Sequence, residues 1–398
     1  MTNSQRTYGN HRAPLPPAES LADGVPSPRA PNKENDRPAP SGRQRDAFFD
    51  NAKYLAILLV AVGHAWGQVL DDRAMETAYR IVYTFHMPAF ILISGYFSRG
   101  FDLGPKRVKR LITGVIVPYV VFETAYSLFE RYGNGNPNYG VTLLDPTYHL
   151  WFLCALVIWR VTTPVWRTVR HPLAVSLVLA ALGSVSPQIG NDLELQRVLQ
   201  FLPFFVLGLT LRPEHFRQVR HRSVRLMSLP VLAAATAVAW YSVPRMHIDW
   251  LYHTSAAQEL SAPWWSGPIM VFGTLACSLV LTACFLSWVP RRRMWFTALG
   301  AGTMYGYLLH GFFVKAGIYA GWFDHPALHE PLGVIGLTVL AAAVTTALCA
   351  APVRRALRCV VEPKMAWAFR QQDPAEVTRG HAPRENSGTC TRDEKVPV

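Results

Sequence analysis

Charged residues are scarce in this chain of 398 residues: they make up 16% of it, while half of the chain is hydrophobic. A soluble globular domain usually carries about a quarter charged residues. The deficit argues against a soluble enzyme. Long apolar runs lie between short basic clusters, a pattern that is typical of membrane-spanning segments.

Several common functional signatures are also missing. The chain has no GxxxxGK[ST] loop and no GxSxG motif, which argues against an ATP-driven pump and against an α/β-hydrolase. Its six cysteines are scattered, with neither a CxxC pair nor a Cys/His ligand spacing. We therefore expect no metal site and no disulfide framework.

The net charge of +13 could indicate a nucleic-acid partner, but the basic residues do not gather into one patch or stripe. They stand beside apolar segments, as the positive-inside rule for membrane proteins produces. The expected partner is therefore the lipid bilayer, and no nucleic acid is expected.

The composition divides the chain into three parts. Residues 1–48 contain eight prolines and almost no large apolar residue before Phe48, which predicts a disordered, Pro-rich cytoplasmic tail. Residues 371–398 are equally polar, which predicts a second disordered cytoplasmic tail. The transmembrane domain is expected between the tails, at residues 49–370.

Ten apolar segments in this domain are candidates for transmembrane helices. They lie near residues 52–70, 78–98, 108–130, 148–166, 173–187, 198–211, 226–243, 267–289, 298–319 and 331–352. The fifth and sixth are shorter than the roughly 20 residues of a perpendicular crossing, so these two are expected to be extended, tilted or partly interfacial.

The distribution of charge supports this number. With the N-terminus in the cytoplasm, ten helices place 33 of the 39 lysines and arginines on the inner side. Removing any one helix would move later basic clusters outside, against the positive-inside rule. The sequence therefore predicts an all-α, polytopic protein of the cell membrane, with about ten transmembrane helices and both termini cytoplasmic.

Titratable residues inside these helices are the first candidates for chemistry, because such groups are costly in lipid and usually face a cavity. Lys53 and His64 are eleven residues apart, so they share one helix face at a separation of about 16 Å along the axis. Asp50 is close to that face. His86 and Glu123 are expected at a depth similar to that of His64. Alternatively, each histidine could bond a neighbouring helix, and Glu123 could tie two helices together.

Four motifs in order resemble a known family. Asp50-Asn51-x-Lys53 leads through apolar residues to Gly63-His64, and it is followed by FHMPAFILISGYFS at 85–98, HLWFL at 149–153 and YGYLLH at 305–310. A basic residue, ten intervening positions and a histidine resemble the first helix of the membrane acyltransferase-3 family. The FHMP and SGYF pair is similar to its fucose 4-O-acetylase subgroup, in which the basic residue is usually lysine, as here.

The resemblance implies an acyl-CoA-dependent O-acyltransferase, in particular an O-acetyltransferase using acetyl-CoA, that modifies a hydroxyl of a carbohydrate or related acceptor. No bound cofactor and no metal are implied. Such transfer needs a base and donors for a developing oxyanion. We assign His64 as the general base, with Asp50 and Lys53 organising the inner entrance; an acyl-histidine intermediate is the alternative to direct transfer. The candidates for substrate binding are His86, Tyr96, Glu123, Trp151, Tyr307 and His310.

A basic cluster at the start of the third predicted helix is the candidate site for the phosphates of CoA. It consists of Lys106, Arg107, Lys109 and Arg110, near the expected cytoplasmic mouth of the Lys53–His64 face, and its charge would attract phosphate. The positive-inside rule alone would also place such a cluster there.

Two other functions compete with acyl transfer. Ten helices would suit a transporter or exporter in which His64, Glu123 and His310 form a proton relay, but the sequence has no internal repeat or paired broken helices of the transporter kind. A noncatalytic membrane scaffold would carry only vestiges of the family motifs. The argument against a scaffold is the joint presence of Lys53, His64, His86 and Trp151.

Overall fold

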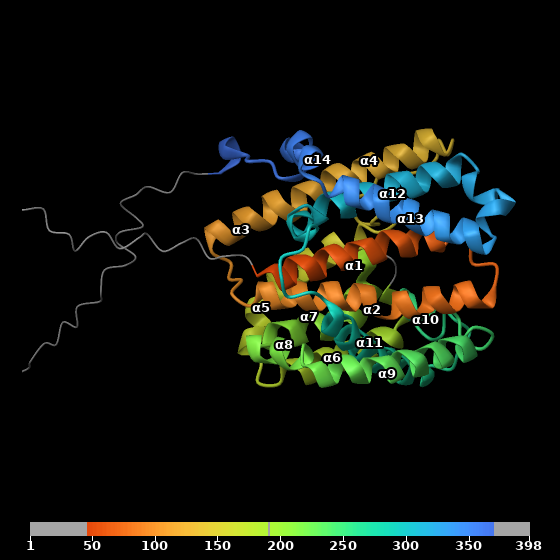
Figure 1. The fold of residues 1–398 in the computed structure, drawn as a ribbon. Helices are drawn as coiled ribbons and strands as arrows, with labels where there is room; N and C mark the ends of the chain where they lie inside the picture. The colour runs from red at the N-terminus through yellow and green to blue at the C-terminus, as the bar shows by residue number, and fades with distance from the viewer. Residues whose placement is uncertain (1–45, 190–191, 370–398) are drawn as a thin grey trace, which may run out of the picture. The chain divides into compact units, whose positions relative to one another are not determined.

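A computed structural model describes residues 46–189 and 192–369, and every regular element within these residues is a helix (Figure 1). One helix, or in the third case an interrupted one, lies in each of the ten segments predicted from the sequence. They are α1 (Ala47–Trp66), α2 (Arg73–Ser98), α3 (Pro105–Leu111) with a π-helical turn (Ile112–Ile116) and α4 (Val117–Gly133), α5 (Trp151–Thr168), α6 (Pro172–Ser184), α7 (Leu195–Thr210), α9 (Arg222–Ser242), α11 (Ser266–Trp288), α12 (Thr303–Tyr319) and α13 (Pro331–Leu348). The short connecting helices are α8 (Pro213–Val219), α10 (Asp249–Tyr252), α14 (Ala351–Ala356) and α15 (Arg358–Val361).

Six helical stretches among the described residues are long and apolar enough to cross a membrane. They are Arg73–Ser98, Pro105–Gly133, Asp192–Thr210, Arg222–Ser242, Ser266–Trp288 and Pro331–Leu348. The all-helical membrane class predicted from the sequence is therefore confirmed. The number of ten crossings stays a prediction, because α6, for example, is apolar but only 13 residues long.

The helix boundaries follow from local chemistry. The side chain of Asp46 accepts a hydrogen bond from the Phe48 amide at 3.0 Å and begins α1, and Asp72 begins α2 in the same way. The predicted tail boundary at residue 48 is therefore too late, since Phe48 is already helical and fully buried. Residues 1–45 and 370–398, which hold the rest of the predicted tails, lie outside the described residues.

The fourth predicted segment, near 148–166, contains a helix that begins three residues later than predicted. Helix α5 begins at Trp151, and Tyr148 has a positive φ of 59°, a conformation that is uncommon for a residue with a large side chain. Pro146 disfavours an α-helical conformation at the residue before it. The Leu150 amide donates to the Thr147 carbonyl oxygen at 3.2 Å, so Thr147 to Leu150 form a turn that leads into α5. Helix α12 similarly begins at Thr303, after the 3₁₀ turn Thr297–Ala301.

Helices α2 and α7 approach each other closely at two glycines. A Cβ atom on Gly95 would lie 2.2 Å from the Phe205 carbonyl oxygen, and one on Gly208 would lie 2.3 Å from the Leu92 carbonyl oxygen. Only glycine permits this backbone contact, which is the usual way in which membrane helices pack tightly. The contact holds α7 against α2, where both helices supply residues to the candidate site.

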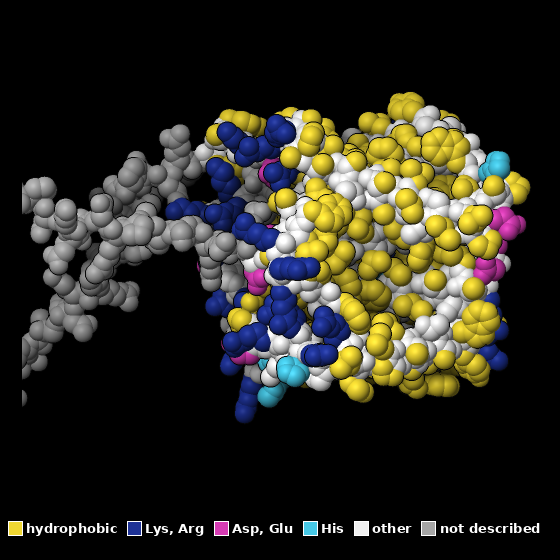
Figure 2. Space-filling view, viewed as in Figure 1, with side chains coloured by type: hydrophobic (Ala, Val, Ile, Leu, Met, Phe, Trp, Pro, Cys, Tyr) yellow, Lys and Arg dark blue, Asp and Glu magenta, His cyan; other side chains and the backbone are white. Residues whose placement is uncertain are grey.

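The surface separates into a basic end and an apolar flank. Lysine and arginine side chains gather at the end of the bundle where α3, α8 and α14 lie, while hydrophobic side chains cover much of the rest of the face shown in Figure 2. Helix α9 exposes most of its residues, including Val238, and α13 exposes large apolar residues such as Ile335. Such large apolar surfaces are unfavourable in water and suit a bilayer.

Candidate functional site

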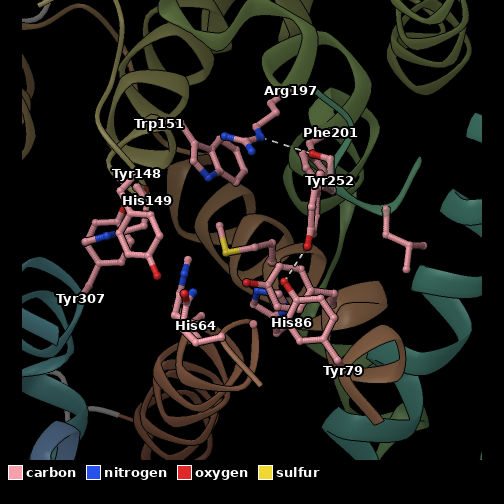
Figure 3. Close-up of a pocket in the computed structure, with 16 residues that line it drawn as sticks. His64, Tyr79, His86, Tyr148, His149, Trp151, Arg197, Phe201, Tyr252 and Tyr307 are labelled. Carbon is pink, nitrogen blue, oxygen red and sulfur yellow. Dashed lines mark hydrogen bonds between the residues drawn. The ribbon is translucent and has the colours of Figure 1, made fainter. Parts of the chain in front are cut away.

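A cavity of about 290 Å³ lies among α1, α2, α5, α7 and α12 (Figure 3). We name it the His64 cavity. His64, His86, His149, Trp151 and Tyr307 all line it. Four of these five residues were predicted as site residues, and His149 belongs to a motif that the sequence analysis identified without assigning it a role.

Three histidines that are far apart in the sequence meet beside this cavity. His64, in the last turn of α1, has its ring centre 5.9 Å from that of His149 and 5.3 Å from that of His310. The rings of His149 and His310 are 4.5 Å apart, and the ring of Tyr148 lies 4.6 Å from that of His64. The structure therefore brings residues of α1, the turn before α5 and α12 into one cluster of aromatic rings.

Hydrogen bonds to backbone carbonyl groups fix the tautomer of His310. His310 Nδ1 lies 3.0 Å from the Gly306 carbonyl oxygen and 2.8 Å from that of Tyr307. Since a carbonyl oxygen only accepts, Nδ1 carries the proton and Nε2 is left as an acceptor. That Nε2 atom and both ring nitrogens of His149 are buried without a hydrogen-bond partner in the described part of the chain. Buried polar atoms of this kind are uncommon and are suited to a ligand.

His86 lines the same cavity as His64 but lies closer to the level of the start of α1. A Cβ atom on Gly63 would lie 3.0 Å from the Tyr83 ring, so residue 63 of α1 is level with residue 83 of α2. Along the helix axes, His86 is therefore about 5 to 6 Å closer to the start of α1 than His64 is. The ring of Tyr83 packs 6.3 Å from His64 and 4.7 Å from His86, and it lies near both. His86 itself donates from Nδ1 to the Val82 carbonyl oxygen at 2.8 Å.

Glu123 does not line the cavity; it holds the turn that leads to His149. Its carboxylate is fully buried and accepts hydrogen bonds from the Thr147 amide at 2.8 Å and from the Thr147 hydroxyl at 2.5 Å. The next residue is Tyr148, with its positive φ, and the hydroxyl of Tyr307 donates to the His149 carbonyl oxygen. Bonds on both sides therefore stabilise a backbone conformation that would otherwise be unfavourable.

Arg197 is a site residue that the sequence analysis missed. Its guanidinium lies 5.1 Å from the Trp151 ring, forms an ion pair of 3.0 Å with Glu194, and donates to the Tyr252 carbonyl oxygen at 3.3 Å (Figure 3). The hydroxyl of Tyr252 is in turn bonded to that of Tyr79 at 2.7 Å. The signal was present, because Arg197 is one of the few basic residues that the predicted topology leaves on the outer side.

A second cavity, of about 270 Å³, adjoins the first on the side of Lys53. We name it the Lys53 cavity. Lys53, Ser94 and Arg160 are the principal polar residues of its otherwise largely apolar lining. Lys53 forms an ion pair of 2.8 Å with the buried Asp50. The two cavities share three lining residues, and these are Val60, Met87 and Tyr307.

Other predicted residues lie away from both cavities. Tyr96 stacks on Phe49, with ring centres 5.1 Å apart, and has the Arg99 guanidinium 3.8 Å from its ring centre. The cluster of Lys106, Arg107, Lys109 and Arg110 lies on α3, at the basic end of the bundle. Arg107 forms an ion pair of 2.8 Å with Asp102, and this hydrogen bond lowers the pKa of the Asp102 carboxyl below its usual value. Lys109 lies 4.8 Å from the Phe369 ring.

The described residues contain no group of three or more His, Cys, Asp or Glu side chains arranged to hold a metal ion.

Comparison with known proteins identifies the wider group. The acyltransferase-3 family pattern, described as an acyltransferase domain, matches residues 46–353. Nodulation protein NolL of Sinorhizobium fredii is 27% identical over 219 residues, which cover 49% of this chain and 58% of the relative. Nodulation protein NolL of Mesorhizobium japonicum is 39% identical over 66 residues, which cover 15% of this chain and 18% of the relative. The chain thus spans less than two thirds of either curated relative. No solved structure matches it.

Proposed function

Because the chain belongs to the acyltransferase-3 family, we propose that it moves an acyl group, in particular acetyl, from acyl-CoA to a hydroxyl of a carbohydrate or related acceptor. The proposal assigns His64 as the general base. It rests on one observation above all: the His64 cavity and the Lys53 cavity share the wall formed by Val60, Met87 and Tyr307.

The two cavities suit the two substrates. The Lys53 cavity presents Lys53 and Arg160 among apolar side chains such as Phe152 and Leu156, which suits the thioester arm of a donor with negatively charged phosphates. The His64 cavity presents imidazole, phenol and guanidinium groups, which suit an acceptor with several hydroxyls. The reacting atoms would then meet at the shared wall, with the donor and the acceptor on opposite sides of it.

The proposed reaction is direct transfer. His64 takes the proton of the acceptor hydroxyl as the oxygen attacks the thioester carbonyl. The tetrahedral intermediate collapses to the ester and expels the CoA thiolate, which takes that proton from His64. His310 is the orienting partner, because its Nε2 is an acceptor near the His64 ring. Tyr148, whose buried hydroxyl has no hydrogen-bond partner in the described ranges, is the donor to the oxyanion.

The topology belongs to the same proposal: about ten crossings of the cell membrane, with both termini and the basic end in the cytoplasm. The gathering of lysine and arginine at one end supports this orientation (Figure 2). Acyl-CoA would then enter beside Lys53, and Lys106, Arg107, Lys109 and Arg110 would attract its phosphates. Reporter fusions after Arg99 and Arg225 should face the cytoplasm, and a fusion near His253 should face outside.

The transporter alternative is not favoured. A proton relay needs Glu123 to exchange protons with His310, but both oxygens of Glu123 accept hydrogen bonds from Thr147, and Ser127 adds a longer one of 3.4 Å. This carboxylate therefore has a positioning role in the proposal rather than a substrate-binding one.

The test is a transfer assay on the full chain in lipid nanodiscs, with radiolabelled acetyl-CoA and a panel of glycoside acceptors. His64→Ala should lower transfer by about 10²–10⁴-fold, the usual effect of losing a general base. His171→Ala is the matched control, because His171 is exposed at the start of α6. Full activity in a correctly folded His64→Ala protein would remove the assignment.

A further inference from the structure

A third hollow lies beside the His64 cavity and differs from it in having a mainly apolar lining. It is an apolar groove of about 580 Å³ between α9 and α11, with Ile81 and Thr84 of α2 at its base. We name it the α9–α11 groove. On α11 its lining runs from Ile269 to Leu281, and twelve helical residues correspond to about 18 Å. The groove is therefore long and runs along the helices, which suits an extended chain.

The α9–α11 groove and the His64 cavity have one lining residue in common. Leu251 of α10 lines both the α9–α11 groove and the His64 cavity. The next residue, Tyr252, lines the His64 cavity and is bonded through its hydroxyl to Tyr79. A molecule that followed the groove past Leu251 would therefore reach the residues that surround His64.

The side chains that line the groove favour a hydrocarbon ligand. Its lining consists mainly of Ala, Val, Met and Leu side chains, and the charge at its end is already neutralised. That charge is Arg80, which is 3% exposed, pairs with Glu76 at 2.7 Å and donates to the Met246 carbonyl oxygen at 2.8 Å. The groove thus offers an alkyl chain a favourable surface and offers a polar ligand no free charge.

The position of the groove indicates where its occupant comes from. Helix α9 exposes apolar residues such as Leu229 and Val238 along the flank that borders the groove, and a bilayer covers such a flank. A lipid could therefore enter sideways, past Leu251, while a donor that arrives through the Lys53 cavity would come past Val60 and Met87, which do not line the groove.

We propose that the acceptor is an amphiphile: its hydrocarbon chain lies in the α9–α11 groove, and its hydroxyl-bearing head group passes Leu251 into the His64 cavity. This inference rests on the proposed function, because it names the class of acceptor for the same site. It predicts that a hydrocarbon tail on the acceptor improves its binding, whereas the tail does not take part in the chemistry.

Gly273 of α11 allows the groove to be filled without disturbing the fold. It lines the groove, and a Cβ atom there would meet nothing within 4 Å, so Gly273→Phe should place its ring in the groove. Gly336 of α13 is the matched control, because a Cβ atom there also meets nothing within 4 Å and it lines neither the groove nor the two cavities. Both positions are exposed.

The binding experiment uses hexadecyl β-glucoside with a diazirine in its chain, photolysed with the full chain in phosphatidylcholine nanodiscs. Labelled peptides should map to α9 and α11, and excess hexadecyl glucoside should compete. Gly273→Phe should lower this labelling at least fivefold, and Gly336→Phe should leave it unchanged. Equal, uncompeted labelling by a diazirine phosphatidylcholine would mean only a lipid-facing surface and would overturn the inference.

The kinetic experiment compares hexadecyl and methyl β-glucoside as acetyl acceptors. The hexadecyl compound should have a KM at least tenfold lower, and Gly273→Phe should remove most of that advantage while leaving transfer to the methyl compound unchanged. Equal kcat/KM for the two acceptors would overturn the inference while leaving the proposed function in place. If hexadecyl glucoside competes for labelling but the folded protein transfers no acyl group, the proposed function is overturned, although the groove binds the amphiphile. The inference would also be overturned if the effect of Gly273→Phe depended on the length of the donor's acyl chain instead of on the acceptor's tail.

Discussion

The two ends of helix α1 differ in the kind of polar group that they present. Near its start, Lys53 pairs with Asp50 beside a largely apolar cavity, with Arg160 as the other cation. Near its end, His64 meets the rings of His149 and His310. One end therefore offers fixed positive charge, and the other offers imidazole groups, which can accept or donate a proton. A single helix can thus separate the binding of an anionic donor from acid–base chemistry.

After the loss expected for His64→Ala, the next largest effect on this comparison is expected at the Lys53 end. Lys53→Ala should lower kcat/KM for acetyl-CoA by about 10- to 100-fold, because a hydrogen bond to a charged group contributes roughly 1.5–3 kcal/mol. It would also leave the buried Asp50 carboxylate without its cation. Lys53→Arg should retain activity within a few-fold, since it keeps the charge. An equal loss in both variants, measured as initial rates against acetyl-CoA concentration, would contradict a role based on charge.

A smaller effect is expected from the group that positions the His64 end. Glu123→Gln removes the charge and leaves only one amide oxygen to accept the two hydrogen bonds from Thr147. We expect kcat to fall by about tenfold with little change in KM, together with a loss of stability on the order of 1–3 kcal/mol. Thr147→Val, which keeps the amide bond, should give a weaker effect of the same kind.

The fall in kcat without a change in KM, expected for Glu123→Gln, distinguishes a positioning role from a simple loss of stability. If the fold were only weakened, the amount of active protein would fall, while kcat per folded molecule and its pH profile would stay unchanged. A misplaced His149 and Tyr148 should instead alter the pH dependence of kcat. An unchanged kcat in the folded variant would rule out the positioning role.

Much of this architecture could be predicted from the sequence, because it depends on local patterns. Apolar length and basic clusters located the helices, and the spacing of Lys53 and His64 placed both on one helix. The turn before α5 could not be predicted, because its conformation depends on Glu123, 24 residues away, and on Tyr307. Arg197 was missed for a related reason: its role depends on packing against Trp151 rather than on any motif.

The donor cluster on α3 is expected to have a modest effect. Changing Lys106 and Arg107 together to Gln should raise KM for acetyl-CoA a few-fold and weaken its dependence on salt, with kcat nearly unchanged, because these side chains act at long range. Arg354 and Arg355 of α14, also at the basic end, provide the matched pair. An unchanged KM in a correctly inserted protein would mean that the cluster determines topology alone, and that Arg212 to Arg225 should be tested next for the phosphates.

The smallest expected effect is on the pH dependence of stability. It concerns two loop contacts, one near each end of α1. In the loop between α1 and α2, Asp71 accepts a hydrogen bond from His329 Nδ1, and His329 Nε2 donates to the Phe323 carbonyl oxygen at 2.6 Å. Both nitrogens act as donors, so the contact fits the protonated ring, and the bond to Asp71 raises the pKa of His329. Its stabilisation is therefore fully present below about pH 6.5, the unfolded pKa, and is lost as pH rises through the raised folded value.

The Asp102–Arg107 contact, in the loop before α3, has the opposite sign. The pKa of Asp102 is lowered, so its contribution is present above the unfolded carboxyl pKa and is lost only in acid. Between pH 6 and 8, only the His329 contact should change. The melting temperature of the wild type should therefore lose about one to three degrees more than that of His329→Gln across this range, while Asp102→Asn should parallel the wild type. Parallel curves for the wild type and His329→Gln would show that the His329 contact does not contribute to stability in solution.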